Sequence, residues 1–97
     1  MRSNYRYVEW DENNIWKNEI KQNVTSEEIE QCFNNPPFII VNHKRHKDRR
    51  VLFGKTLEGR YLFTVFQHID KDTAHPIDSR DMMKQERSFH EKQTKKN

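Results

Sequence analysis

The distribution of hydrophobic positions separates a polar N-terminal part of the chain from an apolar middle. Over residues 38–66, 13 of the 29 positions are apolar, and they fall into three groups separated by polar turns. Short apolar groups with partial alternation, bounded by polar residues, are typical of strands. We therefore predict a meander of antiparallel strands at Phe38–Val41, Arg50–Lys55 and Arg60–His68.

The third predicted strand is apolar on both of its faces. One face carries Tyr61, Phe63 and Val65, and the other carries Leu62, Thr64 and Phe66. A strand of this kind is expected in the centre of a sheet, with helices covering one face and something else, for which a partner is one candidate, covering the other. Before this strand, the segment Thr56–Gly59 predicts a short hairpin loop in which Gly59 has a positive φ.

Two helices are predicted before the meander. Asp11 is a candidate N-cap for a helix over residues 12–22. Thr25 and Glu28 have the spacing of a capping box, which predicts the start of a second helix. This helix is expected to end before Pro36, because proline disfavours the helical conformation of the residue that precedes it.

The chain after the meander predicts one more strand and one more helix. A turn at Asp70–Asp72 is followed by a strand at Thr73–Ile77. Asp78 or Ser79 is expected to cap a helix from residue 80 to about residue 92. The first turn of that helix would place Arg80 beside free backbone amides, an arrangement that favours a phosphate. Arg87 would follow two turns later on the same helix face.

Length and composition restrict the fold and the class of function. The chain has 97 residues, of which 34% are charged and 32% are hydrophobic. One domain is expected over residues 1–97, with a frayed tail at 94–97. The element order predicts an α+β fold: a small antiparallel sheet with two N-terminal helices and a C-terminal helix.

No apolar run approaches the roughly 18 residues of a membrane-spanning helix. The lone Cys32 cannot form an intramolecular disulfide or a thiolate zinc cage, so we expect a protein of a reducing compartment, the cytoplasm. We expect no metal and no cofactor.

Charge is divided unevenly along the chain. Residues 1–37 contain 4 basic and 7 acidic side chains, a net charge of −3, whereas residues 38–97 contain 14 and 8, a net charge of +6. The densest basic cluster lies between the first two predicted strands and contains the RNA-binding candidates Lys44, Arg45, Lys47 and Arg49. Such a loop either binds phosphates or is a solvated hairpin tip that protects the strand edges. We interpret the neighbouring His43 and His46 as surface residues, because no further metal ligand is near them in sequence.

Three segments resemble the BrnT-type toxins, in the order and at the spacing of that family, over residues 7–90. The first segment contains Trp10, Asp11, Asn18, Lys21, Val24, Glu27, Glu28 and Phe33. The second contains Arg50, Gly54, Thr56, Gly59 and Arg60, followed by the apolar strand 62–66. The third, His75–Arg87, is similar to the closing segment of the family. The resemblance therefore covers nearly the whole chain.

This resemblance implies a RelE-like fold and a ribonuclease toxin of a bacterial type II toxin-antitoxin operon, which inhibits translation. The implied partner is a BrnA-type antitoxin, a DNA-binding dimer, in a heterotetramer; a homodimer is the alternative assembly. Ribonuclease chemistry without a metal needs a base for the 2'-hydroxyl, cations for the charged phosphorane and an acid for the leaving oxygen. The family's motif positions that offer such groups are Lys21, Arg50, Arg60, Arg80 and Glu86, with Arg87 as an RNA-binding residue.

One departure from the family pattern concerns catalysis. Where the family has Lys-His-Gly, this chain has Lys21, Gln22 and Asn23, so that an amide replaces an imidazole that titrates near neutral pH. We hypothesise that His75 supplies the acid or base that Gln22 cannot. Two alternatives stay open: a non-catalytic member of the family that binds RNA or a partner protein, and a small structural or adaptor domain whose basic loop is only solvated.

Overall fold

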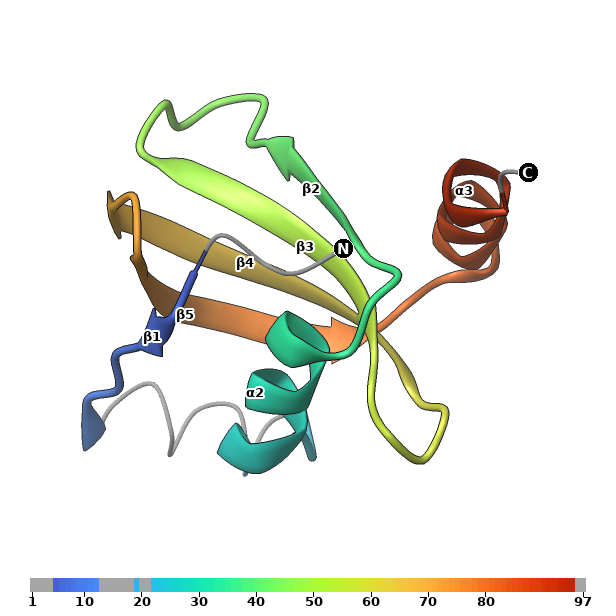
Figure 1. Cartoon of the computed structure of the whole chain (residues 1–97), viewed down its shortest axis with the longest axis horizontal. Helices are drawn as coiled ribbons and strands as arrows, with labels where there is room; N and C mark the ends of the chain where they lie inside the picture. The colour runs from blue at the N-terminus through green and yellow to red at the C-terminus, as the bar shows by residue number, and fades with distance from the viewer. Residues whose placement is uncertain (1–4, 13–18, 20–21, 96–97) are drawn as a thin grey trace.

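A five-stranded sheet forms the centre of the structure (Figure 1). The computed structural model describes residues 5–12, 19 and 22–95. The strands are β1 (Tyr7–Val8), β2 (Ile39–Asn42), β3 (Arg49–Lys55), β4 (Tyr61–Asp70) and β5 (Thr73–Asp81), in the spatial order β1-β5-β4-β3-β2. Strands β2 to β5 are antiparallel neighbours, as predicted, but β1 pairs parallel to β5. The sheet is therefore mixed. The prediction of a purely antiparallel sheet is wrong at this edge, because a two-residue strand carries no pattern that indicates its partner or direction.

Strands β2, β3 and β4, which form the predicted meander, begin and end within two residues of their predicted bounds. In the loop between β3 and β4, Gly59 has a φ of 98°, and its N–H donates to the carbonyl oxygen of Thr56 at 3.0 Å. Glycine adopts this left-handed conformation without steric cost. The predicted hairpin loop is confirmed.

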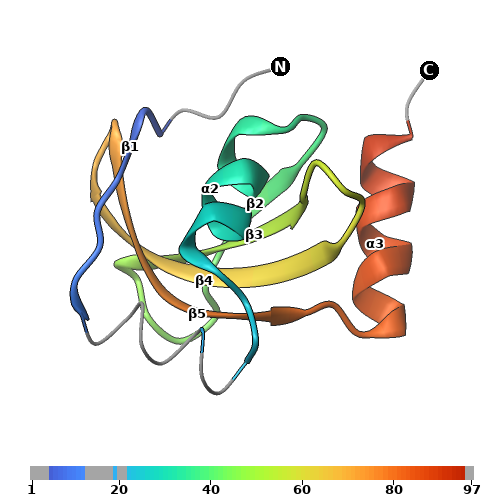
Figure 2. The same ribbon diagram turned by 90° about the horizontal axis from the view of Figure 1, so that it is seen from below.

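Helix α2 (Ser26–Asn34) covers one face of the sheet, as Figure 2 shows. The predicted capping box is present: the Thr25 N–H donates to Glu28 Oε1 at 3.0 Å, and the Glu28 N–H donates to Thr25 Oγ1 at 3.1 Å. The residues that share the core beneath α2 are Ile29, Cys32 and Phe33 of the helix and Leu52, Leu62 and Phe66 of the sheet. We call this side of the sheet the helix face.

The other predicted N-terminal helix, over residues 12–22, lies mostly outside the described residues. The segment just before it makes one contact with α2 and one with the helix face of the sheet. Trp10 Nε1 donates to Glu30 Oε2 on α2 at 2.7 Å. The buried Tyr5 ring lies edge-on to Phe66, with ring centroids 5.0 Å apart. The N-terminal segment therefore contributes to the same core as α2.

The largest difference from the sequence prediction concerns β5. The strand continues to Asp81, and α3 (Lys84–Thr94) follows it, so the predicted helix start at residue 80 is wrong. Ser79 is not a helix cap, because its buried hydroxyl is hydrogen-bonded to Thr64 Oγ1 of β4 at 2.9 Å. Pro76 lies inside β5, next to a register shift and beyond the two residues that pair with β1. Pairing with β4, which the local sequence does not reveal, extends the strand.

Helix α3 lies at one end of the sheet and contacts β2 and β3 (Figure 2). Phe89 packs against Phe53 with ring centroids 4.9 Å apart, and the buried His90 lies edge-on to Tyr61 at 5.6 Å. The apolar cluster on this side of the sheet consists of Val51, Phe53 and Met82 with Ile39, Val41, Tyr61, Phe63 and Val65. We call this side the groove face, because part of this apolar cluster lines a groove on it. Within the described ranges, no helix is both long and apolar enough to cross a membrane.

Candidate functional site

A phenol, a guanidinium and an imidazole meet near the turn between β4 and β5. Arg50 Nη1 donates to Tyr5 Oη at 2.7 Å, and Tyr5 Oη lies 2.8 Å from His68 Nδ1. These three side chains line a hollow of about 280 Å³ together with Lys71 and Asp72. We call Tyr5, Arg50 and His68 the Tyr5 cluster.

Strand alternation brings Arg50 and His68 to the same side of the sheet. Arg50 is two residues from Leu52 on β3, and His68 is two residues from Phe66 on β4; Leu52 and Phe66 both lie in the core beneath α2. Because every second residue of a strand points to the same face, both polar side chains emerge from the helix face where this core ends. Tyr5, only 3% exposed, closes the core at that point.

The Tyr5 cluster contains the groups that acid-base cleavage of a phosphodiester requires. Burial raises the pKa of the Tyr5 phenol, and the charge of Arg50 offsets only part of this effect. The phenol therefore keeps its proton at neutral pH. Because His68 Nδ1 faces Tyr5, a substrate would meet the other ring nitrogen, Nε2. A cation, a neutral proton donor and an imidazole thus line one hollow.

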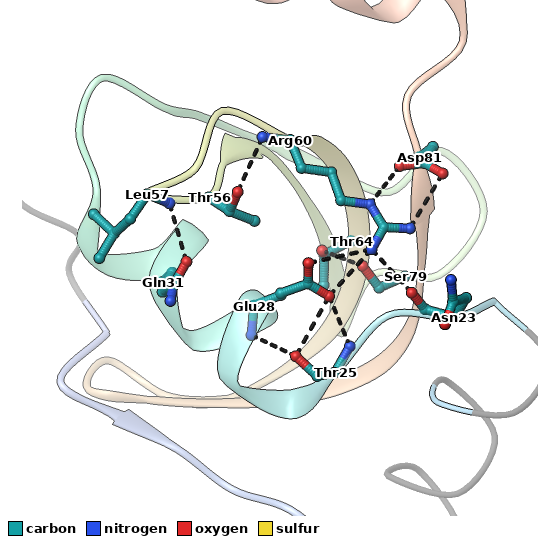
Figure 3. A network of polar contacts seen from close by, with 10 residues as sticks. All are labelled: Asn23, Thr25, Glu28, Gln31, Thr56, Leu57, Arg60, Thr64, Ser79 and Asp81. Carbon is teal, nitrogen blue, oxygen red and sulfur yellow. Dashed lines mark hydrogen bonds and ion pairs between the residues drawn. The ribbon is translucent and has the colours of Figure 1, made fainter.

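Arg60 is held in a separate network (Figure 3). Its Nε and Nη2 donate to the two carboxylate oxygens of Asp81 at 2.7 and 3.2 Å. Its Nη1 donates to Glu28 Oε1 at 3.1 Å and to the carbonyl oxygen of Asn23 at 2.9 Å. The hydrogen bonds with Asp81 are the main cause that raises the pKa of Arg60 and lowers that of Asp81. All three guanidinium nitrogens are engaged, so Arg60 connects the start of α2 to β5 and is poorly placed to bind a phosphate.

Arg80 and Glu86 form a second fixed pair, on the groove face. The two terminal nitrogens of Arg80 donate to the two oxygens of Glu86 at 2.8 and 2.9 Å, and the guanidinium carbon lies 4.2 Å from the centre of the Phe63 ring. Glu86 Oε1 also accepts the Met83 N–H, at 2.7 Å, where α3 begins. The hydrogen bonds from Arg80 are the main cause that lowers the pKa of Glu86. A carboxylate that is ionised and paired in this way is a weak general base.

The register of the sheet arranges the groove face in rows that cross β2 to β5. The first row consists of Ile39, Phe53, Phe63 and Arg80. The second consists of Val41, Val51, Val65 and Asp78, and the third, on β3 to β5, of Arg49, Gln67 and His75. Neighbouring rows are about 7 Å apart along a strand, because alternate residues share a face.

His75 lies in the third row and is paired with acidic side chains. Its Nε2 is 3.1 Å from Asp11 Oδ2, and its Nδ1 is 4.0 Å from Glu9 Oε1. Arg80 is on the same face but two rows away, and Arg50 is on the other face of the sheet. The structure therefore does not bring His75 together with the predicted catalytic arginines. Lys21, the remaining predicted catalytic residue, lies outside the described residues.

The basic residues predicted to bind RNA are divided between two elements. Lys44, Arg45 and Lys47 are exposed in the loop between β2 and β3, and Arg49 is half-buried at the start of β3. His43 Nδ1 accepts the N–H groups of two following residues at 3.1 and 3.2 Å, which gives this loop a defined shape. The loop therefore holds its cations at one end of the sheet, the end that also bears the turn between β4 and β5 (Figure 1).

Arg87 lies on α3, with its guanidinium carbon 4.5 Å from the centre of the Tyr61 ring. The prediction that Arg80 and Arg87 share one helix face is wrong, because Arg80 lies on β5. Cys32 is buried beneath α2, and burial raises the pKa of its thiol to about 12, which excludes a reactive thiolate. In the described part of the chain, no three His, Cys, Asp or Glu side chains gather in a metal-binding arrangement.

Comparison with known proteins assigns this chain to a family. The family described as the ribonuclease toxin BrnT of type II toxin-antitoxin systems matches residues 10–86. The chain belongs to the BrnT family. Among solved structures, the crystal structure of the Brucella abortus ribonuclease toxin BrnT is similar in fold, with a TM-score of 0.64 at 16% sequence identity over 80% of this chain and 97% of that chain. No curated protein sequence matches this chain.

The segment that matches the BrnT family contains Arg50 and His68 but not Tyr5, which precedes it. The sequence analysis identified Arg50 and missed the other two members of the Tyr5 cluster. The alternation along β3 and β4 is the signal that could have grouped His68 with Arg50. No local pattern connects Tyr5 with Arg50, which is 45 residues away along the chain. The cluster in this BrnT-family chain thus depends on the packing of its N-terminal segment.

Proposed function

We propose that this chain is an active ribonuclease toxin of a type II toxin-antitoxin system and that the Tyr5 cluster is its reaction centre. The observation that carries the proposal is the pair of contacts, at 2.7 and 2.8 Å, that join Arg50, Tyr5 and His68 in one hollow. Membership of a ribonuclease toxin family supports RNA as the substrate. The cluster supplies acid, base and cation from side chains alone, so we infer that cleavage is independent of metal ions.

In the proposed reaction, the 2'-hydroxyl oxygen of RNA attacks the adjacent phosphorus, and the bond from phosphorus to the 5'-oxygen of the next nucleotide breaks. His68 Nε2 accepts the proton of the 2'-hydroxyl. Tyr5 gives its proton to the departing 5'-oxygen and regains one from His68 Nδ1, so both side chains end in a neutral form. Arg50 and Lys71 stabilise the negative charge that develops on the phosphorane oxygens. The products are a 2',3'-cyclic phosphate and a free 5'-hydroxyl.

The remaining residues at the family's motif positions then have supporting roles. Arg60 and the pair of Arg80 with Glu86 hold the ends of helices against the sheet. His75, which is paired with Asp11, is the alternative base, and the experiment below distinguishes it from His68. The proposed contacts to RNA phosphates come from Lys44, Arg45, Lys47, Arg49 and Arg87.

We also propose the cellular setting that the family implies. The chain would act in the cytoplasm and inhibit translation by cutting RNA, with a RelE-like fold. Its partner would be a BrnA-type DNA-binding dimer, and two toxin chains with two antitoxin chains would form the assembly. The family membership supports an antitoxin partner of this system.

The test is cleavage of a single-stranded RNA by the purified chain, with and without EDTA. We expect cleavage to persist in EDTA and to yield 2',3'-cyclic phosphate ends. His68→Ala and Arg50→Met should each lower the rate about 100-fold or more, because a positioned acid-base group and a group that stabilises transition-state charge each contribute at least this much. His46→Ala, which removes an exposed loop histidine, is the matched control and should cleave normally.

Three results would contradict the proposal. If His75→Ala abolishes cleavage and His68→Ala does not, the reaction centre is on the other face of the sheet. If EDTA stops cleavage and added Mg²⁺ restores it, the reaction depends on a metal. If the folded wild-type chain binds RNA without cutting it, the chain is a non-catalytic member of the family.

A further inference from the structure

An apolar groove lies on the groove face, away from the Tyr5 cluster. Its volume is about 530 Å³. The side chains on its floor are Val41, Val51, Phe53, Phe63 and Val65, and its rim is formed by the segment from Asn42 to Arg45. The sequence already indicated that the central strand is apolar on both faces, whereas the structure places α2 over one of them only. The groove is therefore suited to a further apolar element.

The rings on the groove floor already have partners. Phe63 lies beneath the Arg80 guanidinium at 4.2 Å and edge-on to Phe53 at 5.3 Å. Phe53 also packs against Phe89 of α3 at 4.9 Å. RNA bases bind single-stranded sites largely by stacking on aromatic faces. Because valines supply the rest of the floor, the groove fits aliphatic side chains of a protein better than it fits bases.

The charge at the rim of the groove determines the kind of protein. Lys44 and Arg45 line the rim, and Arg49 begins the neighbouring strand. In a two-fold dimer whose axis passes near this rim, the basic rims of two copies would lie close together and repel each other. An acidic partner gains from the same charges. Charge complementarity therefore favours a different protein over a second copy of this chain.

We propose that the groove binds the antitoxin of this toxin-antitoxin system, through an amphipathic segment whose aliphatic side chains enter the groove and whose Asp and Glu residues face Lys44 and Arg45. The proposal rests on the part of the proposed function that concerns the antitoxin partner and is independent of the catalytic scheme. Burial of an aliphatic stripe in a groove is a general mode of peptide recognition. The bound segment lies on the face opposite the Tyr5 cluster.

The test is calorimetric titration of the full chain with the purified antitoxin of its toxin-antitoxin system. Val65→Gln introduces a neutral polar side chain into the floor of the groove. Val65→Thr introduces a hydroxyl group and keeps nearly the same side-chain shape as valine. Each should weaken antitoxin binding about tenfold or more, because a polar group would be buried without a hydrogen-bond partner. Leu57→Gln is the matched control, because Leu57 is 71% exposed in the loop between β3 and β4 and lies outside the groove.

The antitoxin titration, RNA cleavage and sedimentation of the free chain together decide the proposal. Weaker antitoxin binding by both Val65 variants, with unchanged RNA cleavage and a normal Leu57→Gln variant, supports it. Unchanged antitoxin binding by a folded Val65→Gln chain overturns it. Loss of RNA cleavage with normal antitoxin binding assigns the groove to RNA, and a dimer of the free chain that Val65→Gln dissociates assigns it to self-association. If the wild-type chain does not cleave RNA, the catalytic proposal fails and the titration still tests the groove.

Discussion

Substitution of Gly54 by alanine tests how closely α2 packs on the sheet. A Cβ atom at position 54 would lie 2.8 Å from Cys32 Cβ and 3.3 Å from the Cys32 carbonyl oxygen. Carbon atoms in contact prefer separations of about 3.5–4.0 Å, so α2 must move by roughly 1 Å at this point. Overpacking of this kind costs roughly 1–3 kcal/mol. At about 4–8 °C per kcal/mol for a domain near this size, we expect Tm to fall by at least roughly 4 °C.

The assay is urea unfolding followed by circular dichroism, in a double-mutant cycle with Cys32. Cys32→Ala keeps the Cβ atom and should leave the cost of Gly54→Ala unchanged. Cys32→Gly removes that atom, so Gly54→Ala should cost about 1 kcal/mol less in this background, as expected for residues in contact. If Gly54→Ala is neutral, or equally costly in all three backgrounds, α2 does not approach β3 as described.

Three further predictions concern α2, the Arg60 network and α3. Thr25→Ala should lower the free energy of unfolding by about 1 kcal/mol, because the capping box is lost, whereas Thr25→Ser should retain most of it; urea unfolding measures both. Arg60→Met should destabilise the chain by about 1–2 kcal/mol, after discounting for the exposure of Asp81, yet leave the RNA cleavage rate unchanged; a folded but inactive variant would show that Arg60 acts in catalysis. Burial lowers the pKa of His90 below its ordinary value of 6.5. Stability should therefore be constant above about pH 6.5 and fall as the pH decreases below it, by at most about 1.4 kcal/mol per pH unit. In urea titrations between pH 5 and 8, the free energy of unfolding of the His90→Gln variant should no longer depend on pH in this way. If its pH dependence is unchanged, another titratable group causes it.

Elements with local signals were predictable from the sequence. The capping box of Thr25 and Glu28 and the positive φ of Gly59 depend on residues within one turn of the chain, and both are confirmed. The end of β5 was mispredicted because it depends on residues that are distant in the sequence. Asp78 and Ser79 have the composition of a helix cap, but Ser79 pairs with Thr64, and β4 supplies hydrogen bonds that no local pattern contains.

The candidate site was predictable only in part. The motif positions singled out charged residues, but they did not show which of them share a face. Arg60 and Arg80 were expected to contact phosphate, whereas carboxylates hold both of them in place. Their chemistry depends on these partners, which are contributed by other elements. Tyr5 lies outside the family match and joins Arg50 and His68 only because it packs into the core beneath α2.

Local patterns were sufficient to predict much of the fold, because they depend on neighbouring residues. The grouping of apolar positions predicted the meander and the two apolar faces of its central strand, and the capping box predicted the helix that covers it. Family motifs were sufficient to indicate a BrnT-type toxin. The parallel edge strand, the separation of the Tyr5 cluster from the groove and the pairing of each arginine emerged from the folded chain. They depend on strand register and on contacts between distant residues, and these are settled when the whole chain packs around one sheet.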